Sequence, residues 1–196
     1  MNYIKSSEEE VLNWLQNNLS EERYTHTLGT AQCAKKLAKQ FGLNEEKAYY
    51  AGLLHDCAKC FSTEELLEII NNHLEVDECQ MLNYKTLHAP VSAFIAETKF
   101  GVEDGEILNS IARHTLGHLQ MSEFDKIVFI ADKIETNTRK IEDSKEIQAI
   151  LDEKDGINKA LLQLYKKTIK SLVKRDLKIC LLTIEIYNQL EDLIKI

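Results

Sequence analysis

Four histidines and two aspartates of this 196-residue chain stand beside apolar residues, at positions where helices are expected to begin, end or lie buried. In chain order they are His26, His55, Asp56, His88, His114 and Asp132. One such histidine is more often a hydrogen-bonded core residue than a ligand, and a lone His-Asp pair is weak evidence. Together, however, imidazole nitrogens and carboxylates are typical transition-metal ligands. The set predicts a metal centre.

Asp132 carries the most information of the six. It lies in "DKIVFIADKIE", a segment that is apolar on nearly every side and is therefore expected to be central. Burying an unpaired carboxylate costs several kcal/mol, about 3–5, unless it is paired or binds a metal. The alternative is a solvated aspartate on a narrow polar strip with Asp125 and Glu135.

A second pattern, Cys57-x-x-Cys60, directly follows His55 and Asp56 and is the competing candidate for a metal site. A four-cysteine zinc site needs a second such pair, and the sequence has none. A redox pair would stand at a helix N-terminus, whereas this pair is expected at a helix C-terminus, where the dipole disfavours thiolate. Both are interpreted as bystanders. All five cysteines are expected to be free thiols: Cys33, Cys57, Cys60, Cys79 and Cys180.

The elements that must position these residues are helical. One proline and seven glycines favour long helices. Helices are expected from Ser20 to Gly42, from Asn44 through Lys59, from Ser62 or Thr63, and over 156–174 and 179–194. "IVFIA" alone could pass for a strand, but its flanks continue the helical period. The chain is predicted to be an all-α, single-domain helical bundle over 1–196, with a metal-binding core at about 20–136 and C-terminal helices at about 143–196 packing on it.

Charge and hydropathy limit the partners. A net charge of −8 argues against broad nucleic-acid binding, and no apolar run approaches the length of a membrane helix. "MNYIKSSEEEVLNWL" has no apolar core of a secretion signal, so a cytoplasmic protein is expected. A small polyanionic substrate stays possible, provided that it meets local cations, and metal ions would be the natural ones.

Five blocks in order resemble a known family: "RYTHTLGTAQCAKKLA", "AGLLHDCAK", "LHAPVSA", "ARHTLGHLQMSEFDKIVFIADKIE" and "TIEIYN". They are similar to the bacterial YqeK-type symmetrical bis(5′-nucleosyl)-tetraphosphatases of the HD-domain metal-dependent phosphohydrolase superfamily. The resemblance covers nearly the whole chain. It implies an HD-type bundle whose ligands fall on the six residues above. It also implies two metal ions, with iron first and manganese or another transition metal as alternatives. A homodimer is plausible.

The resemblance also implies a reaction, the hydrolysis of diadenosine tetraphosphate to two ADP by metal-activated hydroxide. Asp56 would bridge the ions, with His26, His55 and Asp132 completing one site and His88 and His114 the other. The alternatives are another nucleotide phosphohydrolase of the superfamily, acting on mono-, di- or triphosphates, and a nucleotide-binding regulator without turnover.

Lys59 is the best candidate for a phosphate contact and joins Asp56 as a catalytic residue; its alternative is a surface lysine at the helix end. The weaker substrate candidates are Thr115, His118, Lys133 and Arg139. Thr115 could instead cap a helix, and His118 is expected at a pocket edge or on the surface, since Gly117 breaks the helix. Arg139 stands one place later than the arginine of the family's Glu-Pro-x-Arg motif.

Overall fold

The computed structural model describes residues 3–195, and these contain no strand. The all-α prediction is confirmed. None of the described helices is both long and apolar enough to cross a bilayer. The elements are α1 Glu8–Asn18, α2 Glu21–Gln40, α3 Glu45–Leu54, η1 Cys57–Cys60, α4 Thr63–His73, α5 Glu78–Met81, η2 Tyr84–Thr86, α6 His88–Thr98, α7 Gly105–Arg113, α8 Glu123–Ile134, α9 Ile141–Leu151, α10 Gly156–Lys174 and α11 Leu181–Ile194.

The helix starts follow from short polar side chains. Ser20, Asn44 and Ser62 precede α2, α3 and α4, and each side chain accepts a hydrogen bond from the backbone N–H three residues later. Ser122 does the same for α8 and forms a capping box with Asp125. These bonds satisfy N–H donors that the first helical turn leaves unpaired. The determinants of these helix starts are local in sequence, and the predicted starts at Ser20, Asn44 and Ser62 are confirmed.

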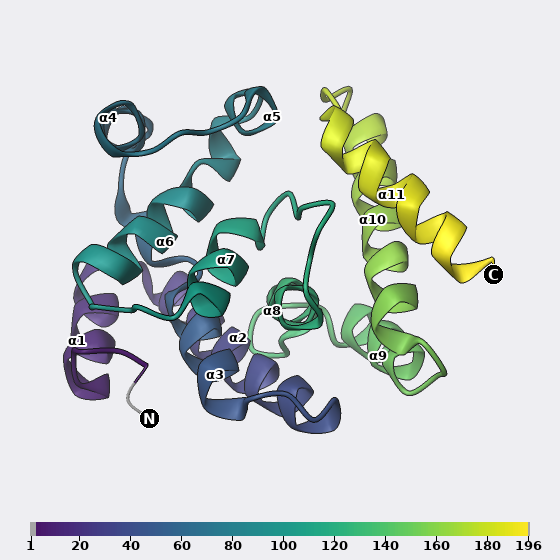
Figure 1. Ribbon diagram of the computed structural model, residues 1–196, viewed down its shortest axis with the longest axis horizontal. Coiled ribbons are helices and arrows are strands. Elements are labelled where there is room, and N and C mark those ends of the chain that lie inside the picture. The colour runs from purple at the N-terminus through teal and green to yellow at the C-terminus, as the bar shows by residue number, and fades with distance from the viewer. Residues whose placement is uncertain (1–2, 196) are drawn as a thin grey trace.

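Helix α8 is the centre of the fold (Figure 1). It packs against α2, α3, α7, α9 and α10, while α10 also packs against α11 at one side of the molecule. Its apolar residues Ile127, Val128, Ile130 and Ala131 are fully buried. Its central position, predicted from "IVFIA", is confirmed. Any polar side chain that α8 turns inward is therefore held in the core.

Helices α2 and α3 form the most extensive contact of the bundle, and Gly52 permits it. A Cβ at Gly52 would stand 2.8 Å from the Cα of Ala31, closer than any side chain tolerates. The missing side chain lets the two backbones touch. This approach brings the end of α3, with His55, next to the second turn of α2, with His26.

The predicted continuation of α3 to Lys59 is wrong. The helix ends at Leu54, His55 is its C-cap, and Cys57–Cys60 forms the separate 3₁₀ turn η1. The cause is a long-range bond: the backbone N–H of Ala58 donates to Ser92 Oγ on α6 at 3.0 Å instead of to a carbonyl one turn earlier. His55 and Asp56 thereby lie at a break between helices.

The expectation of five free thiols is also wrong for two of them. Cys79 in α5 and Cys180 at the start of α11 form a disulfide, with Cα atoms 5.3 Å apart and a sequence separation of 101. Cys33, Cys57 and Cys60 are free. The pairing depends on how the C-terminal helices meet α5, which a sequence pattern does not report. It fastens a peripheral helix to the far end of the chain.

Candidate metal centre

All six residues predicted to bind metal meet in the core, and all are buried. His26 comes from the second turn of α2, His55 and Asp56 from the break after α3, and Asp132 from the last turn of α8. His88 is the first residue of α6 and His114 is the C-cap of α7. Five segments far apart in sequence therefore supply one cluster.

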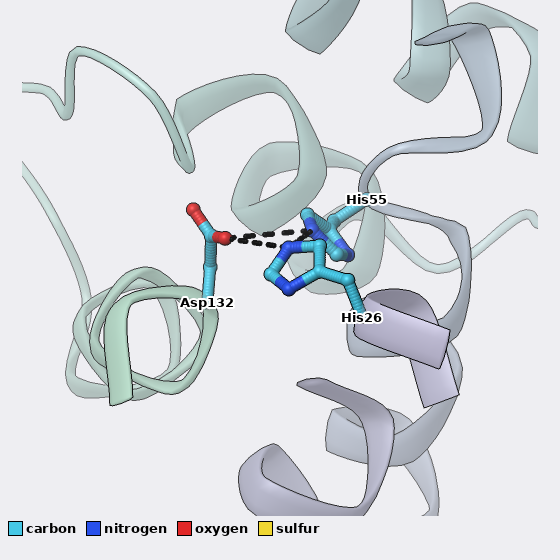
Figure 2. Close-up of side chains that lie close together, drawn as sticks. All are labelled: His26, His55 and Asp132. Carbon is cyan, nitrogen blue, oxygen red and sulfur yellow. Dashed lines mark hydrogen bonds and ion pairs between the residues drawn. The ribbon is translucent and has the colours of Figure 1, made fainter. Parts of the chain in front are cut away.

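The first half of the cluster is shown in Figure 2. His26 and His55 point their imidazoles at Asp132, whose Oδ1 lies 2.9 Å from His26 Nε2 and 3.7 Å from His55 Nε2. Asp56 Oδ2 lies nearby, 3.9 Å from His26 Nε2 and 3.7 Å from His55 Nε2. Donor atoms of His26, His55 and Asp132 lie close enough together to share one ion.

The second half uses the other oxygen of Asp56. Asp56 Oδ1 lies 3.0 Å from His88 Nε2 and 3.4 Å from His114 Nε2. Asp56 thus turns one oxygen to each pair of histidines. A carboxylate between two such groups is the arrangement that can bridge two cations.

Three of the imidazoles are oriented by the backbone. In each, Nδ1 lies within hydrogen-bond distance of the carbonyl oxygen three residues earlier, namely His55 and Gly52 O at 2.6 Å, His88 and Lys85 O at 2.8 Å, and His114 and Ile111 O at 2.7 Å. A carbonyl oxygen only accepts, so Nδ1 carries the proton and donates. In the neutral ring, Nε2 then presents a lone pair to the cluster.

The fourth imidazole is oriented by a carboxylate. His26 Nδ1 lies 3.0 Å from Oε1 of buried Glu135, and the backbone N–H of Asn137 donates to Oε2 of the same residue at 2.7 Å. Gly29 leaves room for this carboxylate, because a Cβ there would collide with it. A carboxylate on the second nitrogen of a metal-binding histidine fixes the ring and raises its basicity.

Electrostatics keeps three imidazoles neutral. Burial lowers the pKa of His55 to about 4 and also lowers the pKa of His88 and of His114. Burial also acts to lower the pKa of His26, but its hydrogen bonds with Asp132 and Glu135 raise that pKa above its ordinary value. A cation at Nε2 of His26 would replace the proton.

The two carboxylates are ionised. Burial acts to raise the pKa of Asp132, but the ammonium of Lys133 and the hydrogen bond with His26 outweigh it and hold that pKa well below its usual range. For Asp56, burial is likewise outweighed by the surrounding imidazoles, and its pKa is also well below its usual range. Both side chains are therefore in the form that binds cations.

The contacts between ligand atoms test whether metal ions fit. Nε2 of His88 lies 3.0 Å from Nε2 of His114, and Nε2 of His26 lies 3.3 Å from Nε2 of His55. His88 and His114 are neutral rings that donate through Nδ1, so their Nε2 lone pairs face one another at 3.0 Å, which is repulsive unless a cation stands between them. Within the described part of the chain, buried Asp56 Oδ1 also has no hydrogen-bond donor. The residues fit a metal centre of nitrogen and oxygen ligands.

Cys57 and Cys60, which follow His55 and Asp56 in the sequence, do not fit a metal centre. Burial raises the pKa of the Cys57 and Cys60 thiols, so they stay protonated. Cys57 Sγ donates to the carbonyl of Ser92 at 3.5 Å, and Cys60 Sγ donates to the carbonyl of Cys57 at 3.4 Å. Each thiol is hydrogen-bonded within the fold, and among the described residues neither belongs to a group of donor atoms that could hold an ion.

A chamber of about 220 Å³ opens over the cluster. Although the chain carries a net charge of −8, five cations and only two carboxylates line this chamber. The cations are Arg23, Lys59, Lys85, Lys133 and Arg139. Such a local excess of positive charge attracts phosphate groups.

Lys59 lines the chamber as the sequence predicts, and burial lowers its pKa. Among the described residues, Lys59 Nζ has no hydrogen bond or ion pair. Arg23 and Arg139 are engaged with the ligands: their guanidinium nitrogens lie 3.3 Å from Asp56 Oδ2 and 3.0 Å from Asp132 Oδ1. Lys59 is thus available to a substrate, as is Lys85, whose Nζ also has no hydrogen bond or ion pair among the described residues.

Of the other predicted substrate contacts, Thr115, Lys133 and Arg139 line the chamber. His118 does not: it lines a different hollow beside α11, and its Nδ1 accepts the backbone N–H of Gln120 at 3.0 Å. Because Gly117 turns the chain with φ of 81°, the side chain leaves the direction of His114.

Three residues at the site were not predicted from the sequence, namely Arg23, Lys85 and Glu135. Arg23 and Lys85 each stand three residues before a ligand histidine, and Glu135 stands three residues after Asp132. In a helix such neighbours lie on the same face, which is the signal that could have found Arg23 and Glu135. Lys85 lies in the short η2 turn, where that rule does not apply.

Comparison with known proteins agrees with this geometry. Residues 23–137 match the family model of the HD domain, and this range holds all six ligand residues. A crystal structure described as a predicted HD superfamily hydrolase involved in NAD metabolism, from Clostridium acetobutylicum, superposes with a TM-score of 0.88 at 36% identity, covering 95% of this chain and 98% of that one. The fold is that of an HD-domain protein.

Curated relatives narrow the family. The symmetrical bis(5′-nucleosyl)-tetraphosphatase of Bacillus subtilis is 35% identical over 182 residues, which is 93% of this chain and 96% of the relative. That of Halalkalibacterium halodurans is 33% identical over 180 residues, 92% and 95% of the two chains. The chain belongs to the HD-domain family and, within it, to the symmetrical bis(5′-nucleosyl)-tetraphosphatases of the YqeK type.

Proposed function

We propose that this chain hydrolyses dinucleoside tetraphosphates symmetrically and converts diadenosine tetraphosphate to two ADP, using two iron ions. The observation that carries the proposal is Asp56, whose two oxygens face two separate pairs of histidine nitrogens. The names of the relatives support the substrate. The His and Asp donor set suits iron, and manganese would bind the same ligands.

The ligands divide as the geometry suggests. His26, His55 and Asp132 with Asp56 Oδ2 would hold one ion, and His88 and His114 with Asp56 Oδ1 would hold the other. When bound, such ions lower the pKa of water and offset negative charge on phosphate oxygens.

The side chains of this chain position the reaction. The carbonyl and carboxylate acceptors at Nδ1 hold the four rings with Nε2 inward. Lys59, free of protein partners among the described residues, would bind phosphate oxygens and offset charge that develops during cleavage. The oxygen of a water molecule bonds to one of the two central phosphorus atoms while the central P–O bridge breaks, and ADP leaves with the bonding electron pair.

Product identity tests the proposal. The iron-loaded chain is incubated with diadenosine tetraphosphate, and the digest is separated by ion-exchange chromatography. ADP is expected as the sole nucleotide product, and removal of metal by a chelator should stop its release until iron is restored. ATP plus AMP as products, or no turnover of the iron-loaded chain, would refute the proposal.

A further inference from the structure

A second hollow, of about 470 Å³, adjoins the cationic chamber. The two share Lys59, Lys85 and His88 as lining residues, so they form one continuous depression. Its volume lies in the range of small-molecule sites, roughly 300–1,000 Å³. A substrate whose phosphates lie in the chamber can therefore extend into this hollow.

The hollow is apolar where the chamber is charged. Phe61 and Leu66 line it, together with Leu82, which follows α5, and Tyr84, the first residue of η2. Leu82 and Tyr84 are exposed, as is the neighbouring Met81. Exposed apolar side chains that gather at a hollow indicate a surface that a ligand covers.

Two polar side chains at this hollow are available to hydrogen-bond with a ligand. Asn83 Oδ1 accepts the backbone N–H of Lys85 at 3.1 Å, and the Asn83 amide N–H groups have no partner among the described residues. The hydroxyl of Thr63 likewise makes no hydrogen bond within the described part of the chain. An aromatic and aliphatic wall with a few free polar groups matches a nucleobase, which has apolar faces and a polar edge.

We propose that this hollow binds one nucleoside of the substrate, with the base against Tyr84 and Leu82 and the adjoining phosphates on Lys59 and Lys85. The proposal rests on the proposed function. Symmetrical cleavage leaves two phosphates between each nucleoside and the broken bond. The lysines shared by the two hollows lie between the apolar wall and the ligand cluster, where those two phosphates would pass.

The test compares two ligands that differ by a nucleoside. Binding of ADP and of pyrophosphate to the iron-loaded full chain is measured by isothermal titration calorimetry. Tyr84→Ala should raise the Kd for ADP about 10-fold, because a base loses its stacking partner, and should leave the Kd for pyrophosphate unchanged. Tyr84→Phe keeps the ring and should bind both ligands as the unmodified chain does.

A matched pair of leucines controls for loss of exposed apolar surface. Leu82 lines the hollow and is 48% exposed, whereas Leu177 does not line it and is 46% exposed. Leu82→Ala should weaken the binding of ADP, and Leu177→Ala should leave it unchanged. Unchanged ADP binding in Tyr84→Ala, or an equal loss for ADP and pyrophosphate, would overturn the proposed subsite.

The outcome is separable from the fate of the proposed function. If the unmodified chain releases ADP from diadenosine tetraphosphate but Tyr84→Ala binds ADP normally, the reaction stands and the subsite is refuted. If the chain releases no ADP but Tyr84→Ala weakens the binding of ADP and not that of pyrophosphate, the subsite stands as a nucleotide site. The tetraphosphatase proposal is then refuted.

Discussion

The ligand cluster and the apolar wall at residues 78–87 border the same depression but are built differently. The six ligand side chains come from five segments of the bundle, and none is more than 5% exposed. The wall is one continuous segment that includes α5 and η2, neither of which contains a buried residue. Its apolar side chains Met81, Leu82 and Tyr84 are 39–54% exposed.

The difference shows how each part keeps its geometry. Packing around α8 holds the ligands, and backbone carbonyls orient their rings. The wall is held by the Cys79–Cys180 disulfide and by local bonds, such as that from Thr86 Oγ1 to the carbonyl of Gln80 at 3.2 Å. Segments with little buried surface open locally at lower free energy than the core. Changes in the core should therefore alter metal binding, and changes at the wall should leave it intact.

The largest expected effect comes from Asp56, because it faces both halves of the cluster. Asp56→Asn should lose both ions and lower kcat about 1,000-fold, since two bound metals contribute several kcal/mol to the transition state. His88→Ala should lose one ion, because His88 Nε2 faces Asp56 Oδ1 and His114, on the second half of the cluster only. Metal content is measured by elemental analysis, and kcat by the rate of ADP release.

The exposed His73, which lies outside the cluster, provides a matched control: His73→Ala should keep both ions. Retention of both ions in His88→Ala would contradict the two-ion assignment. Far-UV circular dichroism would verify that each variant keeps its helices, so that metal loss is not mistaken for unfolding.

A smaller effect is expected at Glu135, which touches a ligand without joining the cluster. Glu135→Ala should weaken metal affinity about 10- to 100-fold, because His26 loses the acceptor at Nδ1. Glu135→Gln keeps a carbonyl oxygen as acceptor and should lose less. Affinity is measured by competition with a metal chelator.

The exposed Glu142 offers the control substitution Glu142→Ala, which should change nothing. Metal affinity that is unaltered in Glu135→Ala would show that packing alone orients His26, and that the carboxylate is dispensable.

The smallest effect on the metal centre is expected from the disulfide. Cys79→Ser should lower the free energy of unfolding by about 2–4 kcal/mol, because the unfolded chain is no longer crosslinked across a long loop. Tm should fall by roughly 5–15 °C, while metal content stays the same. Differential scanning calorimetry and elemental analysis measure the two quantities.

Cys33 is free, so Cys33→Ser tests whether loss of any thiol has the same effect. A Tm that is unchanged in Cys79→Ser, or a loss of metal with it, would refute the separation between wall and core.

Much of the fold was predictable because its determinants are local. The caps at Ser20, Asn44 and Ser62 and the apolar run in α8 are visible in short windows of sequence. The error at α3 has a different origin. Its apolar pattern continues past Leu54, but Ser92, on a distant helix, takes the N–H of Ala58. A local rule contains no information about that bond.

For the site, residue types and their order along the chain were enough to point to His26, His55, Asp56, His88, His114 and Asp132. The folded arrangement was needed to learn that Asp56 turns one oxygen to each histidine pair, that Glu135 holds His26, and that Cys79 pairs with Cys180. Helix starts and buried faces can be predicted because they depend on neighbours within a few turns. The meeting of side chains from α2, α6, α7 and α8 depends instead on how whole helices pack around a common core.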